Sequence, residues 1–159
     1  MSHSLTLIPQ GDRELVMSRV FDAPRERVFA CWTEPELLRR WLTGPPGWMM
    51  AECEADLRPG GRYRYRWQAE DGGDMSMGGV YYEFVAPVRI VCTQLYDQDW
   101  TGGETVGTLL LTEQDGKTLT TNTIRFATPA ARDLALDCGM ERGMASSCER
   151  LDAVLVGAA

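Results

Sequence analysis

The end of the sequence constrains the fold most. From Thr128-Pro129, a capping residue followed by a proline suited to a first helical turn, the chain continues to about Leu155 without another proline. At about 100° per residue, one side of this stretch is apolar. That side carries Leu136, Met140, Gly143, Met144, Ser147, Cys148, Leu151, Val154 and Leu155. We expect one long helix from residue 129 to residue 155 whose apolar stripe covers another surface.

The middle of the chain supplies that surface. Six runs typical of β-strands follow one another, separated by turn residues, at 49–57, 62–69, 77–85, 88–96, 104–113 and 117–126. A further alternating run covers 13–21. Consecutive short strands joined by tight turns predict an antiparallel meander. We therefore expect an α+β domain in which a curved antiparallel sheet of six to seven strands wraps round the C-terminal helix. Because one helix cannot fill a strongly curved sheet, the pattern also predicts an apolar cavity between them.

Two short helices are expected between the first strand and the meander. Asp22-Ala23-Pro24 precedes a helical spacing of apolar residues, and Thr33-Glu34-Pro35 ends that run and begins a second one. Their apolar positions are Val28, Phe29 and Trp32 in the first helix and Leu37, Leu38 and Trp41 in the second. Residues 1–12 are expected to form a flexible tail, and residues 13–156 a single domain.

The turn Arg58-Pro59-Gly60-Gly61 predicts a hairpin and its register. With Pro59 at the tip, one face pairs acidic with basic residues: Glu52 with Arg66, Glu54 with Arg64 and Asp56 with Arg62. The other face pairs small residues with aromatic ones: Ala51 with Trp67, Cys53 with Tyr65 and Ala55 with Tyr63. We interpret the charged rows as a solvated ladder, and the aromatic row as the inner surface of the sheet.

Composition narrows the classes of partner. Sixteen basic and twenty-three acidic residues give a net charge of −7, which would repel nucleic acid and anionic lipid. The five cysteines form no Cys-x-x-Cys pair, and the one histidine is His3, so we expect reduced core thiols, no metal site and no cofactor. No run has the length of a membrane span, and the first ten residues lack the pattern of a signal peptide. The expected location is the cytoplasm.

Several of these segments resemble a known family. They are Phe21-Asp22-Ala23-Pro24-Arg25, the aromatic and acidic positions from Val28 to Trp41, Asp56 to Tyr63, the run Gly79 to Phe84, and the final helix with Gly139-Met140 and Gly143. Over about residues 13–155 the chain is similar to the START-like (SRPBCC, helix-grip, Bet v-type) superfamily, in the branch of activator of heat-shock ATPase homologues. The resemblance implies a helix-grip fold with an internal cavity. Across that superfamily the cavity binds lipids, polyketides, plant hormones or flavonoids, and in some branches cyclises or hydrates polyketides.

Two sets of candidate site residues follow. The ligand-binding set consists of Tyr63, Tyr65, Trp67, Trp32, Trp41, Met140, Met144 and Ser147, although each aromatic or methionine could equally belong to the core. Asp137, Glu83 and Asn122 could polarise a carbonyl group in a dry pocket, but no partner for general acid–base chemistry is visible for any of them.

Three functions remain open. The favoured hypothesis is a binding protein for a small apolar or aromatic molecule of the lipid, flavonoid or polyketide type. The first alternative is a cofactor-free enzyme of the polyketide cyclase or hydratase type. The second is a co-chaperone-like partner of a heat-shock ATPase. A homodimer could form through an edge strand such as 13–21 or through a surface aromatic patch.

Overall fold

The computed structural model of the protein describes residues 4–98 and 102–157. Its elements in chain order are β1 (Thr6–Gln10), β2 (Glu14–Phe21), α1 (Arg25–Thr33), α2 (Pro35–Trp41), β3 (Trp48–Ala55), β4 (Arg62–Ala69), β5 (Asp74–Val85), β6 (Arg89–Tyr96), β7 (Thr105–Gln114), β8 (Lys117–Arg125), α3 (Pro129–Asp137) and α4 (Met140–Leu155).

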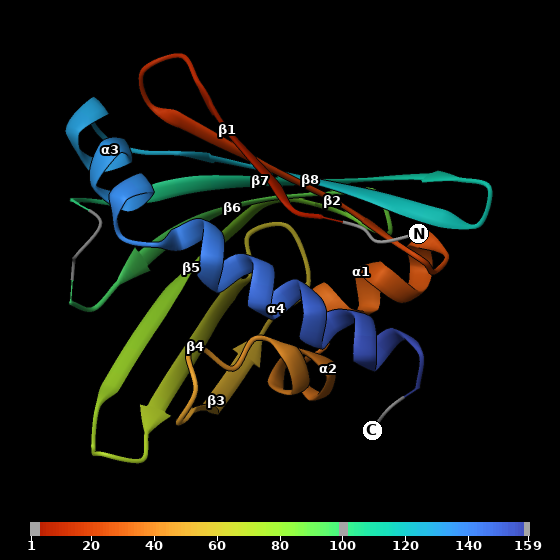
Figure 1. The fold of residues 1–159 in the computed structure, drawn as a ribbon, viewed down its shortest axis with the longest axis horizontal. Coiled ribbons are helices and arrows are strands. Elements are labelled where there is room, and N and C mark those ends of the chain that lie inside the picture. The colour runs from red at the N-terminus through yellow and green to blue at the C-terminus, as the bar shows by residue number, and fades with distance from the viewer. Residues whose placement is uncertain (1–3, 99–101, 158–159) are drawn as a thin grey trace.

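All the strands join one open antiparallel sheet in the order β1-β2-β8-β7-β6-β5-β4-β3. The sheet is curved, and the helices gather on its concave side, with α4 crossing diagonally in front of it (Figure 1). This is the predicted α+β helix-grip architecture, with eight strands among the described residues instead of six to seven.

The additional strand is β1, in the segment where a flexible tail was predicted. Residues Thr6–Gln10 pair antiparallel with β2, and Pro9 lies opposite Leu15. Proline argues against a strand because it lacks the N–H of the ladder, but an edge strand tolerates it. The correction also affects assembly: β2 lies between β1 and β8, so residues 13–21 have no free edge for the suggested dimer.

The C-terminal helix is not continuous, as had been predicted, but divides into α3 and α4. Thr128 caps α3 as expected, because its side chain accepts a hydrogen bond from the N–H of Ala131 at 3.1 Å. The break comes at Gly139, whose φ of 81° lies in the left-handed region that favours glycine. The chain can therefore turn there, so α3 packs at one end of the sheet while α4 crosses its concave face (Figure 1).

The predicted hairpin register is confirmed near the turn and shifts further away. Glu52 faces Arg66, and Cys53 faces Tyr65, as expected. A bulge between Met50 and Glu52 then places Met50 opposite Trp67, where Ala51 had been predicted. The charged ladder is also looser than expected: Glu52 lies 3.7 Å from Arg66, which forms a closer 2.7 Å ion pair with Asp74 on the next strand.

The neighbouring arginines also choose other partners. Arg64 pairs with Asp97 of the turn after β6, not with Glu54. The carboxylate of Asp56 accepts from Arg58 Nε at 2.8 Å, not from Arg62. Exposed charges have several partners of nearly equal energy, so strand register alone does not determine which pair forms.

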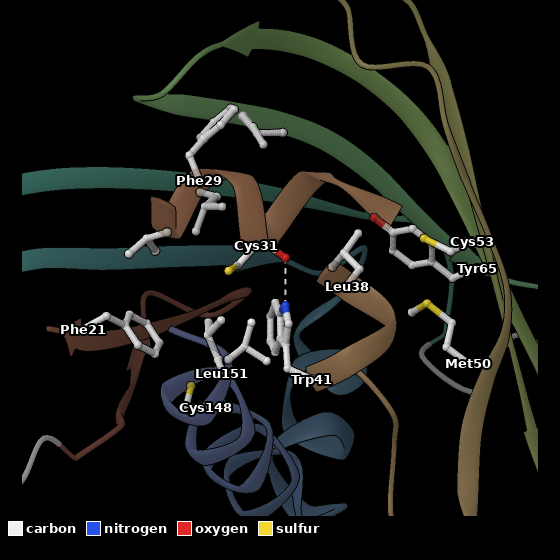
Figure 2. Packing of buried hydrophobic residues seen from close by; sticks show 14 of the residues in the cluster. Phe21, Phe29, Cys31, Leu38, Trp41, Met50, Cys53, Tyr65, Cys148 and Leu151 are labelled. Atoms are coloured by element: carbon white, nitrogen blue, oxygen red, sulfur yellow. Dashed lines mark hydrogen bonds between the residues drawn. The ribbon is translucent and has the colours of Figure 1, made fainter. Parts of the chain in front are cut away.

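The main core lies between α1, α2, α4 and the sheet. Trp41 is fully buried and donates its indole N–H to the carbonyl of Cys31 at 2.8 Å. Figure 2 shows Trp41 beside Leu151 of α4 and near Leu38. Each fully buried side chain of this size contributes roughly 1.5–3 kcal/mol, so this cluster holds both short helices and α4 against the sheet.

An ion pair also joins α4 to the sheet. Arg19 points inward from β2 and is only 5% exposed. Its guanidinium donates to both carboxylate oxygens of Asp152 in α4, at 3.0 and 2.5 Å, and lies 4.8 Å from the ring centre of Phe21. The pair neutralises a buried cation and fixes the position of the last turns of α4.

Candidate functional site

One part of the concave face is an aromatic wall on β4 and β5. Tyr63, Tyr65 and Trp67 occupy successive inward positions of β4, and each is less than 10% exposed. The ring centres of Tyr63 and Tyr65 lie 5.0 Å apart, and that of Tyr81 on β5 lies 5.2 Å from Tyr63. The predicted inward aromatic row is thus present, and Tyr81, which was not singled out, completes it.

Hydrogen bonds anchor this wall at both ends. Tyr63 donates its hydroxyl to the carbonyl of Thr93 on β6, and Trp67 donates its indole N–H to the carbonyl of Leu42 at 2.8 Å. Gly79 allows the first of these contacts, because a Cβ at that position would lie 1.9 Å from the Thr93 oxygen. The wall is consequently a fixed surface.

Burial sets the chemistry of the phenols. It is the main cause that raises the pKa of Tyr63, Tyr65 and Tyr81 far above the ordinary value of 10.0. Burial raises the pKa of Tyr96 and that of the Cys92 thiol as well. These groups stay protonated at neutral pH, so they can hydrogen bond but are poorly suited to act as bases.

A second part of the concave face keeps some accessible surface. Gln94 and Tyr96 lie at inward positions of β6, and Asn122 lies at an inward position of β8, opposite Met17. All three are only partly buried although α3 and α4 cover this side of the sheet. These inward side chains are therefore not fully covered by the helices. We call Gln94, Tyr96, Asn122 and Met144 the inner patch.

Two side-chain amides converge within the inner patch. They stand over Gly107 of β7, where a Cβ would lie 2.9 Å from Gln94 Nε2 and 3.9 Å from Asn122 Oδ1. Thr105 Oγ1 donates to Gln94 Oε1 at 3.1 Å and fixes that amide. The side chain of Asn122 forms no hydrogen bond with any residue in 4–98 or 102–157. An inward amide with unused donors and acceptors suits a ligand that carries a carbonyl or hydroxyl group.

The helix side of the inner patch is formed by methionines. Met144 packs against both apolar clusters of the protein, the main core and a smaller cluster beneath α3, and Met140 packs against the smaller one. Gly143 lies between them, and a Cβ there would meet no atom within 4 Å. Ser147 is buried instead and accepts a hydrogen bond from Arg150 Nη2 at 3.1 Å. Ser147 therefore has a structural partner, while the two methionines are partly buried.

The tryptophans of the short helices belong mainly to the core. Their rings meet edge to face at 4.8 Å, and Trp41 is fully buried. Trp32 is only partly buried, and its indole N–H is enclosed without a hydrogen-bond partner among the described residues.

Two of the three polar candidates do not face the interior. Asp137 is exposed as the last residue of α3, because the break at Gly139 changes the direction of the helix that had been extrapolated through it. The side chain of Glu83 is 50% exposed and forms a 2.6 Å ion pair with Arg89 on the outward face, where a bulge after Tyr81 shifts the alternation. Asn122 is the candidate that faces the inner patch.

The opposite, outward face of the sheet has an open groove of about 400 Å³. Its lining includes Gly78, Gly79, Arg62, Leu95 and Glu104. The ion pair between Arg64 and Asp97 forms part of its lining. The groove is open and carries charges of both signs, so it would enclose a small apolar ligand poorly. We therefore place the candidate site on the concave face.

The part of the chain that the structure describes has neither a metal-binding cluster nor a membrane-spanning helix. No group of three or more His, Cys, Asp or Glu side chains there could hold a metal ion. None of the described helices is long and apolar enough to cross a membrane.

The comparisons with known proteins agree with the fold. Residues 22–156 match the sequence model of the family described as "Activator of Hsp90 ATPase homolog 1-like protein". The chain belongs to this family. The match covers α1 to α4 and the strands β3 to β8 between them. A comparison with curated proteins gave no match.

Solved structures of similar proteins confirm that the chain belongs to the START-like superfamily. A crystal structure from Rhodobacter sphaeroides is 33% identical with a TM-score of 0.91, covering 96% of this chain and 98% of that one. Protein Ms6760 from Mycobacterium smegmatis is 26% identical with a TM-score of 0.83 and the same coverage. A solution structure from Staphylococcus epidermidis is 27% identical with a TM-score of 0.81, covering 94% and 93%.

Sequence reasoning missed Gln94, Tyr96 and Gly107. Alternation along the run 88–96 could have placed Gln94 and Tyr96 on the same side as Cys92, but nothing in the sequence indicated which side faced the helix. The role of Gly107 depends on the register between β6 and β7, which places it opposite Cys92.

Proposed function

We propose that the protein binds a small apolar or aromatic molecule between the concave face of the sheet and α4. The observation that carries this proposal is the inner patch, where inward side chains keep accessible surface beneath a helix. A site with mostly apolar walls and a few convergent polar groups is the usual form of a small-molecule pocket. The adaptable methionines of α4 supply the apolar part, and the aromatic side chains of β4 and β5, which belong to the main core, support the site from beside it.

The charges around the site favour a neutral ligand. The inner patch contains no ionisable carboxylate or ammonium, and the inward Arg19 is already paired with Asp152. A charged ligand buried there would lose its hydration without gaining a counter-ion. A flat molecule with a carbonyl or hydroxyl group could pack against Tyr96, which is only partly buried, and hydrogen bond to Gln94 and Asn122. Flavonoids and aromatic polyketides have this chemistry.

An enzyme of the polyketide cyclase type has less support. Two of the three polar candidates, Asp137 and Glu83, face solvent, and the buried phenols and Cys92 have raised pKa values. The co-chaperone alternative is supported by the family description alone. The five cysteines are free thiols, which fits the reducing conditions of the cytoplasm.

The test is a thermal-shift screen of the purified protein with a flavonoid, a fatty acid and an anthraquinone-type polyketide. A ligand at one hundred times its Kd stabilises the folded state by about 2.7 kcal/mol, which such a screen detects. Asn122→Ala should weaken binding about tenfold, because one hydrogen bond within the pocket is lost. Thr121→Ala, on the neighbouring outward position, is the matched control and should bind normally. If none of the three classes stabilises the protein, or if both variants weaken binding equally, the proposal is wrong.

A further inference from the structure

Gly107 occupies an inward position within β7. Strand register places it between Cys92 of β6 and Ile124 of β8, where the amides of Gln94 and Asn122 converge. Glycine weakens the interior of a strand, so its presence there often marks a place where another group lies close to the backbone. Here that group is the Gln94 amide, because a Cβ on residue 107 would lie 2.9 Å from Gln94 Nε2 and 3.5 Å from Gln94 Cδ. Gly107 therefore lets this amide lie across β7.

Two contacts fix which end of the Gln94 amide lies over Gly107. Thr105 Oγ1 donates to Gln94 Oε1 at 3.1 Å, so the amide oxygen is already used. Burial raises the pKa of the Cys92 thiol, and a hydrogen bond from Gln94, which only the amide nitrogen can donate, opposes that rise. The contact with Cys92 uses one of the two N–H groups of Nε2. The second has no oxygen partner among residues 4–98 and 102–157.

The Asn122 amide approaches the same position from the opposite side. Asn122 lies on β8 and Gln94 on β6, the two strands that flank β7. Asn122 Oδ1 would lie 3.9 Å from the same Cβ, and within the described residues the two amides form no hydrogen bond with each other. Atoms at 2.9 and 3.9 Å from one point are at most about 7 Å apart, while two hydrogen bonds through one oxygen span about 5 Å. A single oxygen that accepts from Gln94 Nε2 and donates to Asn122 Oδ1 fits this gap.

We infer that the ligand of the inner patch is a neutral alcohol or phenol whose hydroxyl group bridges Gln94 and Asn122 above Gly107. A hydroxyl group both accepts and donates, whereas a carbonyl group only accepts. An alkyl group in the same place would leave both amides unpaired. The inference rests on the proposed function and narrows its ligand class to hydroxylated molecules. Gly107 acts as a positioning residue, because a side chain there would push the Gln94 amide away from its place.

Isothermal titration calorimetry with two anthraquinones tests the inference. The probes are 2-hydroxyanthraquinone and 2-methylanthraquinone, which are neutral at about pH 6 and differ only in a hydroxyl or methyl group of similar size. The wild-type protein should bind the hydroxyl probe at least about tenfold more tightly. Gly107→Ala should reduce this preference to about threefold or less, since the end of the Gln94 side chain must move. Thr108→Ala, at the neighbouring outward position of β7, is the matched control and should keep the preference.

A second variant makes the test independent of the backbone change. Gln94→Met removes the amide at similar side-chain length and should also abolish the preference. Circular dichroism should show that Gly107→Ala folds normally, because the atom that its Cβ would meet is the end of a flexible side chain.

Equal binding of the two probes by the wild-type protein would overturn the inference and leave the proposed site intact. A preference that survives in both Gly107→Ala and Gln94→Met, or that disappears in Thr108→Ala as well, would also overturn it. Failure of the wild-type protein to bind either probe would contradict both the inference and the proposed function for this class of ligand.

Discussion

The ion pair between Arg19 and Asp152 gives a stability prediction with a definite asymmetry. Arg19 is 5% exposed, while the side chain of Asp152 is 43% exposed. Asp152→Asn leaves a buried guanidinium without its counter-ion. Removing one partner of a fully buried pair costs about 3–5 kcal/mol, but water can reach this carboxylate, so we expect a loss of about 2 kcal/mol. For a chain of this length that corresponds to a decrease in Tm of about 4–8 °C.

The opposite change should cost less. Arg19→Met removes the buried charge, keeps an apolar stem beside Phe21 and leaves Asp152 where water can solvate it. We expect a loss of about 1 kcal/mol or less. Asp133→Asn is the control, because its ion pair with Arg132 has a 64% exposed carboxylate and should contribute at most about 0.5 kcal/mol. Urea unfolding followed by tryptophan fluorescence measures all three. If Asp152→Asn costs no more than the control, or less than Arg19→Met, the reasoning is refuted.

Three further predictions concern backbone and thiols. Gly79→Ala should destabilise the protein by at least about 3 kcal/mol in urea unfolding, since its Cβ would lie 1.9 Å from the Thr93 oxygen; a loss below 1 kcal/mol would contradict this. Gly139→Ala should cost about 1 kcal/mol, because φ is 81° there, and an unchanged urea midpoint would argue against the break between α3 and α4. Burial raises the pKa of Cys53 and Cys148 from 9.0 to about 11. Unfolded thiols ionise first, so the free energy of unfolding should fall as pH rises from 9 to 11. A urea midpoint that rises over that range would contradict it.

The sequence allowed the fold class to be predicted because its strongest patterns are local. Prolines marked the starts of α1 and α2, although their N-cap residues Pro24 and Glu34 make no side-chain capping hydrogen bond. Thr128 caps α3 as predicted, and the Arg58–Gly61 turn placed the hairpin register near the turn. The errors arise where tertiary structure decides. Pro9 interrupts the strand pattern of residues 6–10, which nevertheless form the edge strand β1. Gly139 ends a helix that periodicity alone would continue. A single bulge shifted Ala51 away from Trp67.

The site was predicted less completely than the fold. The inward orientation of Tyr63, Tyr65 and Trp67 followed from alternation and is confirmed, while their role in binding stays a prediction. Gln94 and Asn122 come together only because β6 and β8 both flank Gly107 of β7, a relation of strands far apart in sequence. Glu83 had been considered because it follows two tyrosines, and Asp137 because an unbroken helix would place it near the apolar side. A bulge and a helix break turned both towards solvent.

The central claim, a ligand between α4 and the concave face, is tested most directly by methyl NMR of the methionines. Met140 and Met144 line the helix side of the site, Met77 lies on the inward side of β5, and Met49 is 59% exposed on β3 outside it. Titration with the ligand that stabilises the protein most should shift the Met144 methyl resonance strongly, the Met140 and Met77 resonances less, and the Met49 resonance not at all. A titration that moves Met49 while Met144 stays unchanged would place the ligand outside this site and contradict the account.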